Sequence, residues 1–145
     1  MVYDRLVVEP SEGLPVWEPV MLRDEVRIPG LRWSIKVCSG VTRDVVYEGE
    51  DAVSFDARFI SLPLEVRPWQ EGDRMVPFGR SGAVKLKRIF TDRKVPSRMR
   101  RYWPLVCKGD EIIWIAGLVR SNAAPVTAKT RKVTILTLLR GEDGQ

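Results

Sequence analysis

The sequence LRWSIKV, residues 31–37, alternates strictly between apolar and polar side chains. Successive side chains of a β-strand point to opposite faces, so this period of two predicts a strand with one face in solvent. A turn signal, Ile28-Pro29-Gly30, stands directly before it. Runs rich in valine, isoleucine and aromatic residues predict further strands at residues 5–8, 16–21, 45–47, 52–55, 64–67 and 133–139.

Two apolar runs in the second half of the chain predict a β-hairpin. Residues 105–107 and 112–115 are apolar, and Lys108-Gly109-Asp110-Glu111 between them supplies the turn. Adjacent strands joined by so short a turn must run antiparallel.

Helical spacing appears in only one part of the chain. Leu86, Ile89 and Phe90 recur at intervals that place them on one face of a helix, and Pro96 ends the pattern. Residues 99–103 repeat the spacing in a second short helix. Many strands with two short adjacent helices predict an α+β fold with mainly antiparallel strands. Because strands do not alternate with long helices, a nucleotide-binding βαβ fold is disfavoured.

Charge divides the chain into two unequal halves. The 145 residues are enough for one well-packed domain, or for one domain with a smaller satellite. Residues 1–61 carry 7 Lys and Arg against 11 Asp and Glu, whereas residues 62–145 carry 17 against 8. We therefore predict a strand-rich acidic segment at 1–61, a basic domain at 62–140 that suits a polyanion, and a frayed tail at 141–145.

Several functional classes are excluded or disfavoured by residues that the sequence lacks. It has no histidine, so a Ser-His-Asp triad and a histidine metal site are impossible. It has neither a GxxxxGK[ST] loop nor a GxGxxG loop. Two distant cysteines, Cys38 and Cys107, are expected to be buried thiols. No apolar run approaches the length of a membrane span or a signal peptide, so a cytoplasmic protein is expected.

The predicted helices carry the strongest concentration of positive charge. Eight cations stand against one carboxylate, Asp92, and they lie off the apolar face of the first helix. The eight are Lys85, Lys87, Arg88, Arg93, Lys94, Arg98, Arg100 and Arg101. Such a density suits phosphate groups, which bind Lys and Arg with release of counterions. The alternative is a solvated helix face, and for the aromatic residues Tyr102 and Trp103 a place in the core is favoured over base stacking.

The acidic residues of the basic half form no catalytic or metal pattern. Asp110 and Glu111 are adjacent on a predicted turn, where solvated carboxylates are expected. Asp73 follows a turn glycine, and we expect it to cap the turn or to pair with an arginine.

From about residue 62 to residue 138, the sequence resembles the C-terminal domain of bacterial tRNA(Ile)-lysidine synthetases. No single motif is specific, but their ordered series is. The series comprises Leu-Glu-Val-Arg (64–67), Gly72-Asp73-Arg74, Pro77 and Gly79, Val84-Lys85-Leu86-Lys87, Ile89-Phe90, Lys94-Val95-Pro96, Arg100, Trp103-Pro104-Leu105, and Ile113-Trp114-Ile115-Ala116-Gly117-Leu118.

The resemblance implies the following function. The family attaches lysine to the wobble cytidine of an isoleucine tRNA with a CAU anticodon, and ATP activates the base. Catalysis belongs to an N-terminal domain with an SGGxDS-type loop, which is absent here, so we expect a fragment without a catalytic residue, cofactor or metal. ATP with magnesium, and lysine, are expected for the missing domain. The family's C-terminal domain is a layered unit, similar to a domain of the phenylalanyl-tRNA synthetase β-subunit, that holds the acceptor-stem side of the tRNA.

The resemblance also assigns roles to individual residues of the expected RNA site. Lys85 and Lys87 match the paired lysines of the family, and Arg74 matches the arginine of its Gly-Asp-Arg motif. Arg100 matches a recurrent arginine that the resemblance suggests is structural and pairs with Asp73. The sequence departs from the family where Arg88, Met99 and Arg101 replace frequent acids. These arginines raise the local positive charge and put the role of Arg100 in question.

Two other classes of function stand beside RNA binding. In the first, the acidic half docks the missing catalytic domain or a second copy of the chain as a homodimer, and the basic helix meets an acidic protein surface. The second is a free-standing hydrolase or transferase, which the absence of histidine, a phosphate loop and an acidic pair disfavours.

Overall fold

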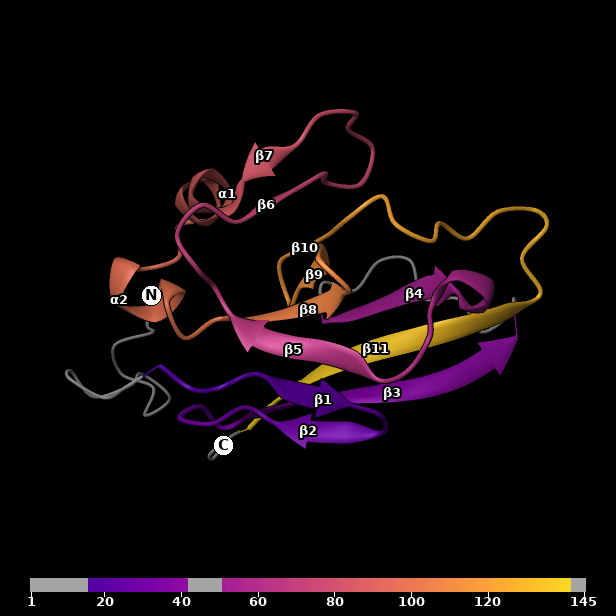
Figure 1. Ribbon diagram of the computed structural model, residues 1–145, viewed down its shortest axis with the longest axis horizontal. Helices are drawn as coiled ribbons and strands as arrows, with labels where there is room; N and C mark the ends of the chain where they lie inside the picture. The colour runs from indigo at the N-terminus through magenta and orange to yellow at the C-terminus, as the bar shows by residue number, and fades with distance from the viewer. Residues whose placement is uncertain (1–15, 42–50, 142–145) are drawn as a thin grey trace.

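A five-stranded antiparallel sheet contains most strands of the basic half. The computed structural model describes residues 16–41 and 51–141 (Figure 1). The strand order is β1-β5-β8-β9-β10. These strands are β1 (Val20–Leu22), β5 (Leu64–Pro68), β8 (Pro104–Lys108), β9 (Glu111–Ile115) and β10 (Val119–Arg120).

A second, four-stranded antiparallel sheet has the order β2-β3-β11-β4. It comprises β2 (Glu25–Arg27), β3 (Trp33–Val41), β11 (Lys132–Arg140) and β4 (Ala52–Asp56). The last strand of the chain, β11, pairs with β3 over nine residues and with β4 over five, so it lies inside the sheet.

The remaining elements are short. The two-stranded β6–β7 ribbon, β6 (Arg74–Met75) and β7 (Val84–Lys85), leads directly into α1 (Leu86–Asp92). Helix α2 (Ser97–Arg100) follows, and a 3-10 turn, η3 (Ala57–Phe59), follows β4. Figure 1 shows α1 and the β6–β7 ribbon standing above the two sheets.

One hydrophobic core joins both sheets and the helices. The Trp33 ring of β3 meets the Trp103 ring edge-on at a centroid distance of 5.0 Å, and Phe90 of α1 lies 6.2 Å from Trp103. Trp103 is fully buried and donates its indole N–H to the Ala116 carbonyl at 2.8 Å. Edge-on aromatic pairs contribute roughly 0.5–1.5 kcal/mol beyond area burial, so this cluster fixes where α1 sits on the sheets.

Most predicted elements are confirmed within the described residues. The alternation in residues 31–37 is borne out, since Trp33 and Ile35 are buried while Lys36 is exposed. The hairpin, both helices and the strands at 52–55, 64–67 and 133–139 are present, and the strand predicted at 16–21 is shorter, at Val20–Leu22. The strands predicted at 5–8 and 45–47, and most of the predicted tail, lie outside the described residues.

One cysteine prediction is wrong. Cys107 is buried, and burial raises the pKa of its thiol to about 11. Cys38 is exposed, because β3 presents alternate side chains to solvent and Cys38 follows Lys36 by two residues on that face.

The two charge halves are interleaved in both sheets. Strand β1 pairs with β5, and β11 pairs with β3 and β4, so each sheet joins strands from before and after residue 61. Trp17 also donates its indole N–H to the Tyr102 carbonyl at 3.0 Å, beside α2. The boundary at residue 61 therefore marks a change of charge and not of sheet membership.

Candidate nucleic-acid interface

Helix α1 separates an apolar face from a basic one. Leu86, Ile89 and Phe90 are buried in the core, whereas Lys87 and Arg88 are exposed. Lys85, at the end of β7, is the N-cap residue and its side chain caps nothing. The apolar face anchors the helix, so its cations remain at the surface.

The end of α1 holds a lysine in an unusual backbone conformation. Val95 N–H donates to the Phe90 carbonyl at 2.9 Å and Lys94 N–H to the Thr91 carbonyl at 3.1 Å. This is the Schellman arrangement, which requires a left-handed residue at the position of Lys94. Its φ is 60°, where glycine is usual, and Val95 is buried. The turn thus holds the exposed Lys94 beyond the helix end.

The second helix is fixed by buried side chains. Met99 and Trp103 are fully buried, and Tyr102 is 6% exposed. This confirms the core role favoured for the two aromatic residues over base stacking. Arg98 and Arg101 remain exposed beside them.

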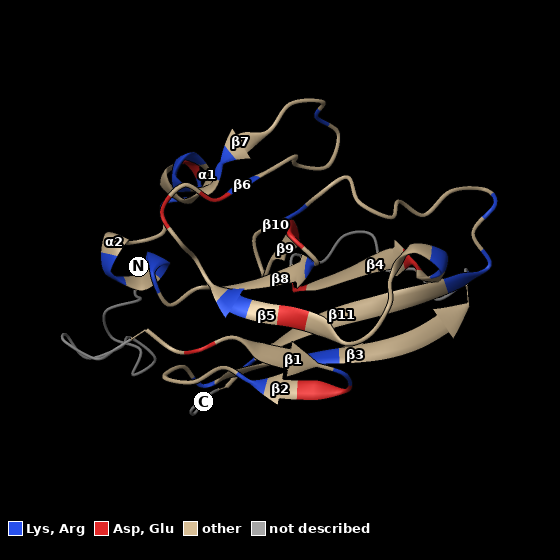
Figure 2. Ribbon diagram, viewed as in Figure 1, with Lys and Arg blue, Asp and Glu red and all other residues tan. Residues whose placement is uncertain are grey.

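The nine predicted RNA-binding residues gather at one end of the molecule. Figure 2 shows their elements, β6, β7, α1 and α2, together above and beside the tip of β5. Eight of the nine side chains are exposed and Arg100 is half-buried. We call this set the basic end: Arg74, Lys85, Lys87, Arg88, Arg93, Lys94, Arg98, Arg100 and Arg101.

Two arginines of the basic end also have structural contacts. Arg93 Nη1 donates to the Leu118 carbonyl at 2.9 Å. Arg100 Nε donates to the Val95 carbonyl at 2.9 Å, and its Nη1 donates to Thr91 Oγ1 at 3.3 Å. The Arg93 bond ties the end of α1 to the segment after β9, and the Arg100 bonds fix the turn between the helices.

The suggested pairing of Arg100 with Asp73 is wrong. Asp73 accepts from Arg67 at 2.9 and 3.0 Å in a two-pronged contact, and from Gln70 N–H at 2.7 Å. The hydrogen bond that Arg67 donates to Asp73 is the main cause that raises the pKa of Arg67. Asp73 therefore does what was expected, pairing with an arginine and closing a turn, but its partner comes from β5 and Arg100 contacts Val95 instead.

Little negative charge opposes the cations at the start of α1. In the described part of the chain, Asp92 is the one carboxylate within salt-bridge distance of Lys85, Lys87 or Arg88, at 4.0 Å from Arg88 Nε. Both side chains of that pair are mostly exposed, so it contributes little to stability. Lys85 and Lys87 have no such partner among residues 16–41 and 51–141.

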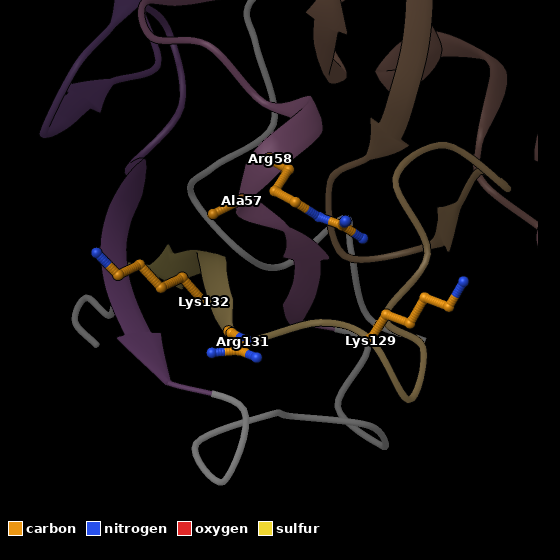
Figure 3. A pocket seen from close by; sticks show the side chains of 5 residues that line it. All are labelled: Ala57, Arg58, Lys129, Arg131 and Lys132. Atoms are coloured by element: carbon orange, nitrogen blue, oxygen red, sulfur yellow. The ribbon is translucent and has the colours of Figure 1, made fainter.

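A second basic location lies at the opposite end of the long axis, and the sequence analysis missed it. A cavity of about 420 Å³ is lined by Ala57, Arg58, Lys129, Arg131 and Lys132 (Figure 3). In Figure 3 the side chains of Lys129 and Lys132 extend in opposite directions, so their charges surround the cavity and do not converge on one point. Three cations within Lys129-Thr130-Arg131-Lys132 were the available sequence signal.

A buried carboxylate lies beneath this second location. Asp56 is 1% exposed and accepts hydrogen bonds from the Arg58 side chain at 2.8 Å and from Thr130 Oγ1 at 2.8 Å. These bonds, the one from the Arg58 side chain foremost, hold the pKa of Asp56 well below its ordinary value, although burial alone would raise it. Asp56 therefore ties η3 to the loop before β11.

Neither a metal centre nor a membrane segment is found in the described parts of the chain. No three potential ligands among residues 16–41 and 51–141 gather closely enough to hold a metal ion. No helix there is long and apolar enough to cross a bilayer.

Known proteins resemble this chain over its basic half or nearly its whole length. The family model of the TilS substrate C-terminal domain matches residues 64–136. A tRNA(Ile)-lysidine synthase of Geobacter sulfurreducens is 39% identical over 84 residues, covering 58% of this chain and 18% of that protein. One of Caldanaerobacter subterraneus subsp. tengcongensis is 31% identical over 142 residues, covering 93% of this chain and 30% of that protein. The chain thus spans less than a third of these relatives.

Two solved structures share the fold. A crystal structure of a TilS C-terminal domain is 32% identical with a TM-score of 0.72, covering 90% of this chain and 95% of that one. An N-terminal fragment of the phenylalanyl-tRNA synthetase β-subunit from Pyrococcus horikoshii has a TM-score of 0.52 and 18% identity, covering 60% of this chain and 27% of that one. The second likeness concerns the fold alone, and it confirms the layered architecture that the resemblance implied.

Proposed function

The chain belongs to the family of TilS substrate C-terminal domains. From this premise, we propose that it binds the tRNA substrate of a tRNA(Ile)-lysidine synthase and takes no part in the chemical reaction. The ordered motifs supported that family, and the relatives and the structural neighbour confirm it.

The reaction belongs to the rest of the protein. In this proposal a separate catalytic domain uses ATP, with magnesium, to activate the wobble cytidine of an isoleucine tRNA with a CAU anticodon, and lysine then attacks. The present chain supplies affinity and orientation. Holding a substrate at a remote place raises the effective concentration of the reacting groups, which is where a non-catalytic domain contributes to rate.

The observation that carries this function is the exposed positive charge at the start of α1. Lys85, Lys87 and Arg88 are exposed on rigidly anchored elements, and Asp92 is the only opposing carboxylate within reach in the described residues. A surface of this kind binds the phosphates of an RNA helix without reading its sequence. The acceptor stem is an A-form duplex, which proteins recognise through backbone and shape.

Charge reversal at three positions tests the proposal. Replacing Lys85, Lys87 and Arg88 by glutamate should weaken tRNA binding by roughly tenfold or more at low salt. It should also reduce the log–log salt slope by about 3, because each lost phosphate contact removes about one unit. Filter binding over a salt series measures both quantities, and circular dichroism checks the fold.

A matched control separates local contact from total charge. Arg23, Arg27 and Lys108 are also exposed but lie on the turns and strands of the sheets. Their triple glutamate variant changes the net charge equally, and it should retain most of the affinity. Equal weakening in both variants, or in neither, would exclude the basic end as the site. A concentration-dependent dimer that ignores RNA, seen by light scattering, would favour the protein-interaction alternative.

A further inference from the structure

The turn that joins β6 to β7 is held in one conformation by a neighbouring loop. Gly79 N–H donates to Asn122 Oδ1 at 2.8 Å, and Asn122 Nδ2 donates to the Arg80 carbonyl. The backbone adds a bond from Phe78 N–H to the Arg120 carbonyl at 2.9 Å and one from Asn122 N–H to the Val76 carbonyl at 3.1 Å. The turn is therefore fixed on both of its sides.

This rigid turn presents an aromatic ring to solvent. Phe78 is 60% exposed, the highest value among the exposed large hydrophobic residues that the structure describes. Gly79, with φ of 85°, reverses the chain directly after it. A side chain that only covered the core would turn inward, as Met75 does on the same ribbon.

A half-buried arginine supports one face of the ring. The Arg120 guanidinium lies 5.2 Å from the centroid of Phe78 and 4.2 Å from that of Phe55. It donates to the carbonyls of Ser121 and Ala123 at 3.0 and 2.8 Å, and also to the Ser54 carbonyl. Burial lowers the pKa of Arg120 to about 10, so it remains charged at neutral pH.

We propose that Phe78 is a stacking surface for an unpaired base of the RNA that the basic end binds. This inference rests on the proposed function and adds a second kind of contact to it. Arg120 covers one face of the ring, which leaves the other for a flat apolar partner. Every nucleobase offers such a face, so stacking holds single-stranded RNA with little regard to sequence.

The charges around the turn favour RNA over an apolar protein surface. Arg80 is exposed next to Phe78, and Arg74 and Lys85 are exposed on the β6–β7 ribbon that leads to it. Figure 2 shows these cations continuing from α1 along the ribbon. In single-stranded RNA, each base is flanked by phosphates of the backbone. An aromatic ring flanked by cations can stack on the base while the cations contact these phosphates. Phe78 would therefore contact the end of a stem where pairing stops.

The test compares two RNA probes with the same duplex. One is blunt-ended, and the other carries a short single-stranded 3′ overhang. The wild-type chain should bind the overhang probe about tenfold more tightly, as expected for one stacked base. Phe78→Ala should remove that preference and leave blunt-duplex binding unchanged, whereas Phe78→Trp should keep it. Quenching of a fluorescent base analogue in the overhang should follow the same order.

Phe59 provides the matched control. It is 48% exposed, with the Arg58 guanidinium 5.0 Å from its ring centroid, but it belongs to η3 and not to the turn between β6 and β7. Phe59→Ala should therefore keep the overhang preference. If Phe78→Ala also keeps it, or weakens both probes equally, the stacking role is excluded and the ring is structural or binds protein. Failure of the wild-type chain to bind either probe would instead refute the proposed function, and with it this inference.

Discussion

Asp56 shows how one buried carboxylate joins distant parts of the chain. It lies at the end of β4, and its hydrogen bond to Thr130 connects positions 74 residues apart. Because Arg58 and Thr130 both donate to it, the charged form is the one that the fold stabilises. Its effect on stability must therefore depend on pH.

The pH dependence has a definite sign. A carboxyl whose pKa is lower in the folded chain stabilises the fold above its unfolded pKa of about 4, and this contribution is lost as pH falls below that value. Asp56→Asn should lower the free energy of unfolding at pH 7 by about 1–3 kcal/mol, since Arg58 loses its charged partner and one of the two acceptor oxygens becomes an NH2 donor. Urea unfolding at several pH values should show that acid lowers the free energy of unfolding less in the variant than in the wild-type chain. An unchanged acid profile would mean that other carboxylates dominate.

For Asp73, the sequence predicted the kind of role but not the partner residue. The sequence predicted its role, because an aspartate after a turn glycine has few other uses. The partner was not predictable from the local pattern. Arg67 reaches Asp73 because β5 ends and turns back within six residues, whereas Arg100 is held by the Val95 carbonyl.

At the scale of elements, the end of α1 combines strain with charge. Lys94 occupies a left-handed position that costs a non-glycine residue roughly 1 kcal/mol. Lys94→Gly should relieve this strain and stabilise the chain by about 0.5–1 kcal/mol relative to Lys94→Ala. Both variants should lose RNA affinity equally, because both remove one cation. Thermal unfolding and filter binding measure the two effects, and equal stability of the two variants would contradict the strain.

The length of an element decided whether the sequence predicted it. The nine-residue strands β3 and β11 and the apolar face of α1 carry enough residues to show a period. Strands β2, β6, β7 and β10 have two or three residues each, and only their pairing partners make them strands. The sequence could have predicted the exposure of Cys38, because the alternation through Lys36 places both residues on the same face.

At the scale of the whole molecule, Gly117 marks a close approach between the end of β9 and strand β11. It follows β9 of the five-stranded sheet, and an added Cβ would lie 2.8 Å from Leu138 Cδ2 of β11 and 2.5 Å from Arg140 Nη2. Its φ is 77°, so a side chain is also strained there. Gly117→Ala should cost about 2–4 kcal/mol in the free energy of unfolding.

A second glycine controls for the substitution itself. Gly82 has open space around its would-be Cβ and no positive φ, so Gly82→Ala should change stability by no more than about 0.5 kcal/mol. Urea unfolding of both variants measures the difference. Similar costs at the two positions would mean that the sheets adjust freely to each other.

The charge pattern predicted the basic end but not the second basic location. Eight cations within one passage, Lys85 to Arg101, are visible in the sequence because they lie close together along the chain. The cavity beside Asp56 combines Arg58 with Lys129, Arg131 and Lys132, and only folding brings these segments together. The same holds for the setting of Phe78, whose supporting Arg120 lies far along the chain.

The central place of β11 means that the four-stranded sheet is completed by a strand from late in the chain. Both of its neighbours, β3 and β4, leave the ribosome long before it does, yet in the finished sheet they touch β11 and not each other. Until residues 132–140 emerge from the ribosome, the four-stranded sheet lacks the strand between β3 and β4. Trp33 of β3, which packs against Trp103, then lies on an incomplete sheet. The four-stranded sheet therefore closes only when residues 132–140 insert between β3 and β4.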